Sequence, residues 1–452
     1  MLFNVLNNEN SSMFHPGNFK ISIWKLTFIS LLLVISFPIK SVSLLFLILY
    51  NFYFILQVIC KKIMINKLII VYFLFLFLFQ CVLVSYLYSP LFIYNVFLFF
   101  IFISPILWFI ATKEWRSAKN LSYQEIKEVI ETYLKIQIFF SFINMIYRIA
   151  IRGFSFDTDF GDIVAGTFRM PFTYKADVSN PIFALSMSLI LIYYIVVYKK
   201  RVNKLLILLS FLIIFLASVN HLILALLLSG VIAYFNRYFF RILIIGIVVY
   251  FLYSLFQPGN FLMIGERVQK IFQVFTNLDF LNKIGYKGQY LYKWIQDFTD
   301  NKLFFIFTGV GAGTYSSRAA MFFSGDYIQG FPFENMSDFM KHNTFYLWKK
   351  YLAAPAWMQG SFNYPFNSLF TLIAELGAVN VLVISVLFWK TLKGIKIYNV
   401  SHRIFIIVLL FLLGFVDNYY EYYQVFFIFY LLHFILLKSN YKVLSDESIS
   451  ST

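Results

Sequence analysis

The sequence predicts an all-α polytopic membrane protein, and three observations support this. Of the 452 residues, 61% are hydrophobic and only 13% are charged, whereas soluble domains average about 25% charged residues. Apolar runs close to the ~20 residues that a membrane helix requires recur along the chain. Lys and Arg residues gather at alternate junctions between these runs. A water-soluble core of this length could not hide so much apolar surface.

About twelve segments qualify as candidate spans, the last few of them short. The runs lie at 20–38, 41–60, 67–88, 90–112, 129–151, 178–198, 205–219, 221–236, 242–256, 366–389, 404–416 and 425–437. The first run follows a polar stretch of about 20 residues and lacks a small-residue cleavage site, so we expect no cleavable signal peptide.

The distribution of positive charge predicts the orientation of the spans. Cytoplasmic loops of membrane proteins carry an excess of Lys and Arg. If the N-terminus is cytoplasmic, the basic junctions fall on the cytoplasmic side: KKIMINK (61–67), TKEWRSAK (112–119), KKRVNK (199–204), Arg237 with Arg241, and KTLKGIK (390–396). We therefore expect both termini in the cytoplasm and segments 152–177 and 257–365 on the outer face. The formal charge of +16 is explained by this pattern, and nucleic acid is not an expected partner.

Three regions follow from this topology. Residues 1–256 form an N-terminal bundle of about nine spans with the outer loop 152–177. Residues 257–365 form a large extracytoplasmic loop between the ninth and tenth spans. Residues 366–452 contain the C-terminal spans and a cytoplasmic tail.

The predicted orientation restricts the chemistry of the large loop, because ATP is absent outside the cytoplasm. The glycine cluster GVGAGTYSSR (309–318) also lacks the Gly-Lys-Ser/Thr ending of a phosphate-binding loop. Its glycines could form a backbone nest for an anion, or a tight turn with close helix packing. A reaction here needs a substrate that is already activated, and a lipid-linked diphosphate is such a substrate.

The first outer loop offers charged candidates. Arg169 is either an ordinary charged residue of the loop before a helix, or an arginine whose guanidinium binds phosphate oxygens bidentately. Asp157, Asp159 and Asp162 are explained by solvated loop acids, and less well by a metal or acid–base cluster, because the further oxygen ligands and the glutamate of a calcium loop are missing. Cys60 and Cys81 lie in or beside apolar runs and indicate neither a disulfide framework nor a thiolate metal site.

Two titratable residues and one aromatic junction complete the candidates. His221 follows a tight turn and could be structural, a base, or a hydrogen-bond donor to phosphate. Glu375 lies about 13 Å along its predicted span. A carboxylate at that depth costs free energy, so it either faces a polar cavity or pairs with a cation of a neighbouring helix. The junction DNYYEYYQ (417–424) could stack on sugars, but an interfacial aromatic belt is the simpler interpretation.

The layout resembles the O-antigen polymerase and ligase superfamily, the Wzy-like proteins. The resembling motifs are Gly166-Thr167-Phe168 followed by Asn180, the turn Ser218–His221, the glycine turn Gly309–Gly313, and Asn367-Ser368 with Glu375 and Gly377. Two departures argue against a ligase. Phe366 stands where ligases have a histidine, and Gln289, Tyr290 or Lys293 stands where an arginine is usual.

The resemblance implies a polymerase of polysaccharide repeat units, for O-antigen or capsule, in the bacterial inner membrane. Its substrates would be glycans linked to undecaprenyl diphosphate, and its partners the bilayer, a chain-length regulator and a flippase. We expect no cofactor and no metal. The expected catalytic residues are Glu375 and then His221. The expected residues that bind the diphosphate or glycan are Arg169, Arg267, Arg318, Asn180 and Asn367. The alternatives are a ligase-type glycan transferase and a flippase or transporter of lipid-linked oligosaccharides.

Overall fold

The structure is a computed structural model that describes part of the chain. The described residues are 23–115, 123–152, 164–170, 179–198, 201–217, 219, 221–234, 244, 285–323, 367–395 and 398–439. Arg267, the three loop aspartates and the predicted span 242–256, apart from residue 244, lie outside them. Within the described ranges nearly all secondary structure is helical, with one small two-stranded sheet.

The N-terminal half forms a bundle of apolar helices. The bounds are α1 (Ile23–Ile35), α2 (Lys40–Ile59), α3 (Lys67–Leu87), η2 (Pro90–Phe92), α4 (Ile93–Ala111), α5 (Tyr123–Arg152), η4 (Gly166–Phe168), α6 (Ser179–Tyr198) and α7 (Lys204–Leu216), followed by the helix His221–Tyr234. Polar residues cap some helix starts: the Asn203 side chain accepts from the Leu206 amide, which satisfies one unpaired N–H of α7.

Two short strands join this bundle at one end. Strand β1 (Ile63–Ile65) pairs antiparallel with β2 (Thr112–Trp115), and Ile63 lies opposite Trp115. Both strands fall in junctions that the charge pattern assigns to the cytoplasm.

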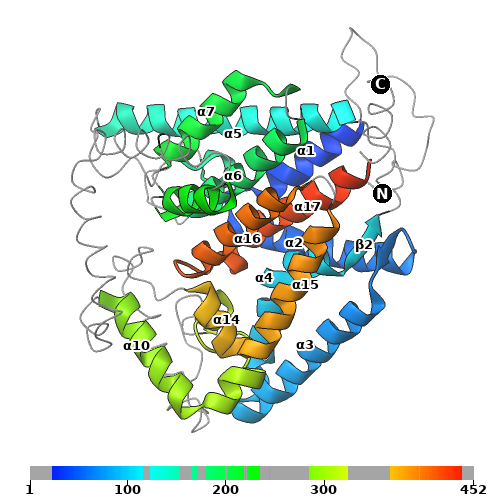
Figure 1. Cartoon of the computed structure of the whole chain (residues 1–452), viewed down its shortest axis with the longest axis vertical. Coiled ribbons are helices and arrows are strands. Elements are labelled where there is room, and N and C mark those ends of the chain that lie inside the picture. The colour runs from blue at the N-terminus through cyan, green and yellow to red at the C-terminus, as the bar shows by residue number, and fades with distance from the viewer. Residues whose placement is uncertain are drawn as a thin grey trace.

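The C-terminal half contains both regular and broken helices. The bounds are α10 (Gly285–Asp300), the π-helical turn η7 (Phe304–Thr308), α11 (Arg318–Phe323), α14 (Ser368–Leu376), α15 (Ala378–Gly394), α16 (Val400–Gly414), η11 (Tyr419–Glu421) and α17 (Tyr423–Ser439). Helix α17 packs against α4 and α6 in the middle of the molecule (Figure 1).

The helical membrane fold agrees with the sequence prediction at a coarse level. Five helices are long and apolar enough to cross a membrane: Ser41–Ile59, Lys67–Leu87, Pro90–Ala111, Gln124–Ile151 and Asn180–Tyr198. Five shorter apolar helices lie at other predicted spans. On α2 and α3, large side chains such as Phe52, Leu68 and Phe75 remain exposed, as expected of surfaces that face lipid. The count of twelve spans stays a prediction.

The predicted continuous span 366–389 is instead two helices. Helices α14 and α15 meet at Gly377 with a bend of 119°. Gly377 has φ 85°, and a Cβ there would lie 2.6 Å from the backbone carbon of Phe307. The break therefore brings α14 and α15 against η7, and hydropathy cannot reveal it because apolar residues continue across the glycine.

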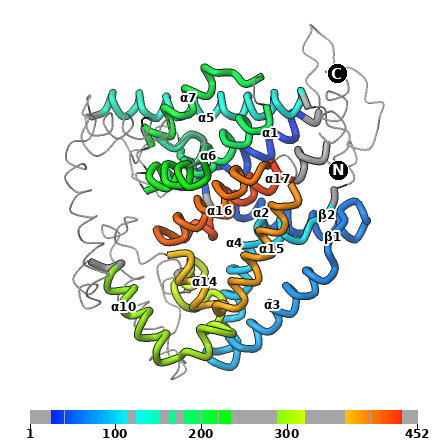
Figure 2. The backbone as a smooth tube through the Cα atoms, in the orientation of Figure 1, coloured from blue at the N-terminus to red at the C-terminus, as the bar shows by residue number. Residues whose placement is uncertain are grey.

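The described part of the large loop, 285–323, packs into the bundle. Turn η7 contacts both α14 and α15. The tube in Figure 2 shows the lower ends of α3 and α15 converging near α14, away from the β1–β2 sheet. The glycine-rich stretch thus lies against α14 and α15, and the predicted extracytoplasmic position of residues 257–365 stays a prediction.

Candidate functional site at the glycine turn

The glycine turn, residues 308–318, is buried and held by amide side chains from two helices. Gln80 of α3 donates to the Thr308 carbonyl oxygen at 2.8 Å and accepts from the Ala312 amide at 2.9 Å. Asn95 of α4 donates to the Gly313 carbonyl oxygen at 2.8 Å. Amides placed inside apolar helices are costly unless they are paired, and here they fix the path of the turn.

Two positions of this turn must be glycine, because the backbone there lies directly against the backbone of neighbouring helices. Gly309 has φ 71°, and a Cβ there would lie 2.2 Å from the Glu375 backbone oxygen. Gly313 has φ 75°, and its Cβ would lie 2.5 Å from the Asn95 backbone oxygen. No larger residue fits at such distances, so these glycines allow the tight turn and its close packing.

The carboxylate of Glu375 is the anion in a backbone nest formed by the same turn. One oxygen accepts from the amides of Tyr315, Ser316 and Ser317 at 2.9, 3.1 and 2.9 Å. The other oxygen accepts from the Gly313 amide at 2.7 Å. The Glu375 side chain is fully buried. The geometry favours a carboxylate that holds the turn; the catalytic role predicted for Glu375 stays a prediction.

A second buried carboxylate, that of Glu421, binds the next backbone amide of the turn, that of Arg318. The bonds from the turn amides to Glu375 and Glu421 are called the clamp. The Arg318 amide donates to both oxygens of Glu421, at 2.9 and 2.7 Å. Asn418 donates to one Glu421 oxygen at 3.1 Å and to the Ser316 carbonyl oxygen at 3.2 Å. Two glutamates, from α14 and η11, thus bind consecutive amides along the turn and fix the position from which the Arg318 side chain projects.

The Arg318 guanidinium lies over an aromatic ring of the last junction. Its central carbon is 4.3 Å from the centroid of the Tyr422 ring, within cation–π range. The Tyr422 hydroxyl donates to Asp417 at 2.6 Å. Arg318 therefore lies against the aromatic and acidic side chains of the junction 417–422, and its predicted contact with a diphosphate or glycan stays a prediction.

His221 contacts the same junction from another helix. Its Nε2 lies 2.5 Å from the Tyr419 hydroxyl, and the two rings pack at 63° with centroids 5.9 Å apart. Residues His221, Arg318 and Glu375, predicted separately, thus converge around 417–422.

The turn that carries Arg169 is held in a comparable way on another side of the bundle. Gln137 of α5 accepts from the Thr167 amide at 3.0 Å and donates to its hydroxyl at 2.6 Å. The Thr167 hydroxyl donates at 2.9 Å to the hydroxyl of Ser36, the residue that follows α1. A Cβ on Gly166 would lie 2.1 Å from Gln137. Arg169 is only 1% exposed, so this arginine is buried among helices.

The side chains of the two predicted asparagines form hydrogen bonds with backbone groups of the helical bundle. Asn180 is buried and donates to the Ala217 carbonyl oxygen at 3.4 Å. Asn367 caps α14, because its side chain accepts from the Phe370 amide at 3.2 Å and donates to the Phe415 carbonyl oxygen at 2.8 Å. The geometry favours structural roles for these residues, and their predicted contact with substrate stays a prediction.

Sequence reasoning missed the importance of the junction 417–423. Its tyrosines 419, 420, 422 and 423 are all buried, so an interfacial belt is the wrong interpretation. The missed signal is Asp417 and Glu421 placed among tyrosines: acids between aromatic residues in a junction indicate buried hydrogen bonds. Gln80, Asn95 and Gln137, isolated amides inside apolar runs, gave a similar signal.

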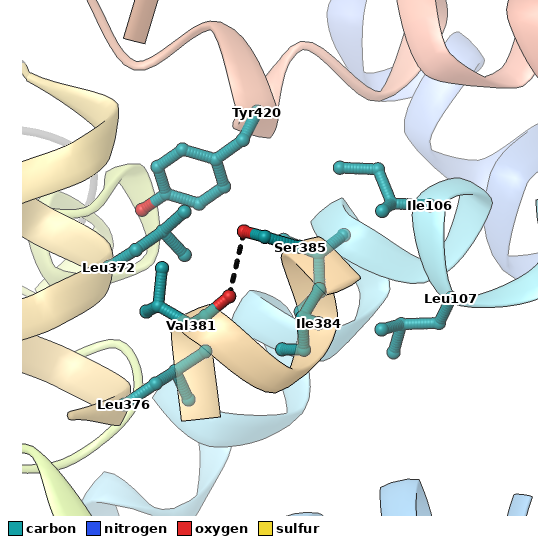
Figure 3. Close-up of a pocket in the computed structure, with 9 residues that line it drawn as sticks. Ile106, Leu107, Leu372, Leu376, Val381, Ile384, Ser385 and Tyr420 are labelled. Carbon is teal, nitrogen blue, oxygen red and sulfur yellow. Dashed lines mark hydrogen bonds between the residues drawn. The ribbon is translucent and has the colours of Figure 1, made fainter. Parts of the chain in front are cut away.

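An apolar cavity lies beside the bend of α14 and α15. Its volume is about 60 Å³, and its walls include Ile106, Leu376, Ile384 and Tyr420 (Figure 3). The Ser385 hydroxyl at its edge donates to the Val381 carbonyl oxygen at 2.8 Å. The walls of this cavity are almost entirely apolar, so the polar cluster of the glycine turn is the better candidate site.

Glu421 gives the site a predicted pH dependence. Burial, and then the charge of Glu375, raise the pKa of Glu421 from 4.5 to about 8. Between pH 4.5 and about 8 the folded state binds more protons than the unfolded state, so the free energy of unfolding falls as pH rises, by up to about 1.4 kcal/mol per pH unit.

We expect the melting temperature of the protein in detergent to decrease between about pH 5 and about pH 8. In Glu421→Gln this decrease should be smaller. Asp300→Asn, at an exposed carboxylate, is the control; an equal slope in Glu421→Gln would contradict the prediction.

No cluster that could hold a metal is found in the part of the chain that the structure describes. Fold and site together define an α-helical membrane protein with a buried polar cluster, in which two arginine-bearing glycine turns are held by side chains of the bundle. No protein family, characterised protein or solved structure matches the chain.

Proposed function

We propose that the chain is a repeat-unit polymerase for polysaccharides carried on undecaprenyl diphosphate, acting at the outer face of a bacterial inner membrane. A growing glycan on the lipid diphosphate is the donor, and a single lipid-linked repeat unit is the acceptor. An acceptor hydroxyl attacks the anomeric carbon of the donor, its proton passes to a base, and undecaprenyl diphosphate leaves with the electron pair of the broken bond.

The convergence of Arg318 and His221 on the junction 417–422 is the observation that supports this proposal most. Arg318 lies over Tyr422, and His221 contacts Tyr419. Charge develops on the leaving diphosphate in the transition state, so fixed cations and N–H donors aimed at it accelerate the reaction. The diphosphate contacts predicted for Arg169 and Arg267 gain no support here, because Arg169 is 1% exposed at a separate turn and Arg267 lies outside the described residues.

The base that takes the acceptor proton is the less constrained part of the mechanism. A general base needs a lone pair within reach of the acceptor hydroxyl. Glu375 already accepts four amide hydrogens through its two oxygens. Glu421 accepts from the Arg318 amide and from Asn418. Using either carboxylate as a base would release part of the turn.

A transporter of lipid-linked oligosaccharides is the second candidate, because of the broken helix. Discontinuous helices form substrate sites in many transporters, and α14 and α15 meet at 119°. The ligase alternative gains no specific observation, and Phe366 stands where ligases have a histidine.

Glycan profiling of a deletion strain discriminates between these functions. For a polymerase, we expect the deletion to leave single repeat units attached to their final acceptor and to remove the long polymer. Absence of any glycan outside the cytoplasmic membrane would indicate the transporter. Full-length chains that remain unattached would indicate the ligase.

A further inference from the structure

Arg318 is held at its backbone and at its charged end. Its amide donates to both oxygens of Glu421 at 2.9 and 2.7 Å, and its guanidinium carbon lies 4.3 Å from the centroid of the Tyr422 ring. The Arg318 residue is only half-buried. An arginine side chain has several rotatable bonds, and a cation stabilises a developing negative charge best when its position is fixed before the reaction. The contact with Tyr422 therefore fixes the charged end of a side chain whose backbone is already fixed.

The Tyr422 ring is in turn bound to a carboxylate. The Tyr422 hydroxyl donates to Asp417 Oδ2 at 2.6 Å. Burial, and then the charge of Asp417, raise the pKa of this hydroxyl well above its usual value, so the hydroxyl keeps its proton and remains the donor. A hydroxyl that donates to an anion is polarised and makes its ring richer in electrons, and a cation is attracted by the negative face of a ring. Asp417 therefore strengthens the contact between Tyr422 and Arg318.

The Asp417 carboxylate has a fixed position because its own residue is bound on two sides. Its Oδ1 accepts from the Asn418 amide at 2.7 Å. Its backbone oxygen accepts at 3.1 Å from the amide of Ser368, the first residue of α14. Asp417 is 2% exposed. The start of α14 thus sets the position of this carboxylate, and the carboxylate sets the orientation of the Tyr422 ring.

We propose that Asp417 and Tyr422 are positioning residues that hold the Arg318 guanidinium, Tyr422 through its ring and Asp417 through the Tyr422 hydroxyl. The inference rests on the proposed function, in which the guanidinium binds oxygens of the leaving diphosphate. A guanidinium has five N–H donors that lie in its own plane, and it contacts an aromatic ring through its face. The contact with Tyr422 therefore fixes the cation without consuming the donors that bind phosphate oxygens.

Fluorination of the ring at position 422 tests the cation–π contact. Phenylalanine and its mono-, di- and trifluorinated analogues, introduced into the full-length chain by stop-codon suppression, have nearly the same size but a progressively less negative ring face. We expect the melting temperature in detergent to fall with each added fluorine. We expect the polymer made in a complemented deletion strain to fall in the same order, by between about twofold and about thirtyfold over the series.

The same series at Phe427 of α17 is the matched control. Phe427 is 1% exposed, and its ring packs edge-on against the Tyr50 ring with centroids 4.6 Å apart. Fluorination there tests the effect of a changed aromatic ring in the buried bundle, and we expect unchanged polymer. A fall at position 422 that a purely structural ring would also cause should therefore appear at position 427 as well. No trend at position 422, or an equal trend at position 427, overturns the positioning role of Tyr422.

A double-mutant cycle tests whether Asp417 acts through Tyr422. In Asp417→Asn the amide oxygen can still accept from the Asn418 amide, but the NH₂ group would donate to the Tyr422 hydroxyl and draw electrons from the ring. We expect Asp417→Asn and Tyr422→Phe each to lower polymer synthesis by about twofold to about fivefold per folded protein. In the Tyr422→Phe background, Asp417→Asn should have no further effect. An equal loss from Asp417→Asn in both backgrounds overturns the role of Asp417.

Failure of the proposed function has a different outcome from failure of this inference. If the deletion strain makes polymer of normal length, the polymerase proposal fails, and the melting temperatures of the fluorinated series still show whether Tyr422 holds Arg318. If the polymer is lost in the deletion strain but its amount does not depend on fluorination at position 422, only the positioning role fails.

Discussion

Replacement of Glu375 by alanine is expected to prevent the accumulation of folded protein. Four buried amides, those of Gly313, Tyr315, Ser316 and Ser317, would lose their acceptor. Each buried donor left without a partner costs about 1–3 kcal/mol, and the sum approaches the ~5–15 kcal/mol by which folded domains are stable. Size-exclusion chromatography of the detergent-solubilised protein should show loss of the monodisperse peak.

The substitution Glu375→Gln distinguishes a structural carboxylate from a catalytic one. Glutamine keeps the volume and one oxygen, which can still accept from the three amides at 315–317, but its NH₂ group would face the Gly313 amide. We expect a folded protein with a clearly lowered melting temperature. A Glu375→Gln protein that melts like wild type but makes no polymer would instead support the catalytic role predicted from the sequence. A wild-type peak for Glu375→Ala would refute the clamp.

Replacement of Arg318 by alanine is expected to reduce polymer synthesis by about 10²–10³-fold, the contribution typical of one preorganised group at a developing negative charge. The clamp to Glu421 uses the Arg318 backbone amide, which alanine retains. The substitution therefore removes the guanidinium and its contact with Tyr422 and leaves the turn in place. Polymer length and amount, measured by gel electrophoresis of the glycan from a complemented deletion strain, give the result.

Two further variants control for charge and for folding. Lys302→Ala removes an exposed cation between α10 and η7 and should leave polymer synthesis unchanged. Arg318→Lys keeps the charge but not the planar fork that binds two phosphate oxygens, so we expect intermediate synthesis. Normal polymer from an Arg318→Ala protein that melts close to wild type would remove Arg318 from the proposed site.

Local features of the sequence predict the helices well. The run 67–88 corresponds to α3, Lys67–Leu87, and the run 178–198 corresponds to α6, Ser179–Tyr198. Hydropathy is a property of consecutive residues, so each apolar run indicates its own helix. The break at Gly377 escaped this reasoning because it depends on η7, whose residue Phe307 lies against the glycine.

The candidate site could be predicted only in part. Arg318, His221 and Glu375 stand out because charged or titratable residues are rare in an apolar chain. Their partners do not: Tyr419 is 198 positions from His221, and the Gly313 amide is 62 positions from Glu375. Hydrogen-bond partners so distant in sequence leave no local pattern.

Composition and the spacing of apolar runs are enough to predict a helical protein that is apolar enough for a membrane, because each run indicates the solvent that its own helix requires. The contacts of the few polar residues depend on how the helices pack. The packing brings the Glu375 carboxylate to the backbone amides of the glycine turn, the Arg318 amide to Glu421, and Tyr419 to His221. A buried polar group needs a hydrogen-bond partner, and the partners come from segments that lie far apart in the sequence.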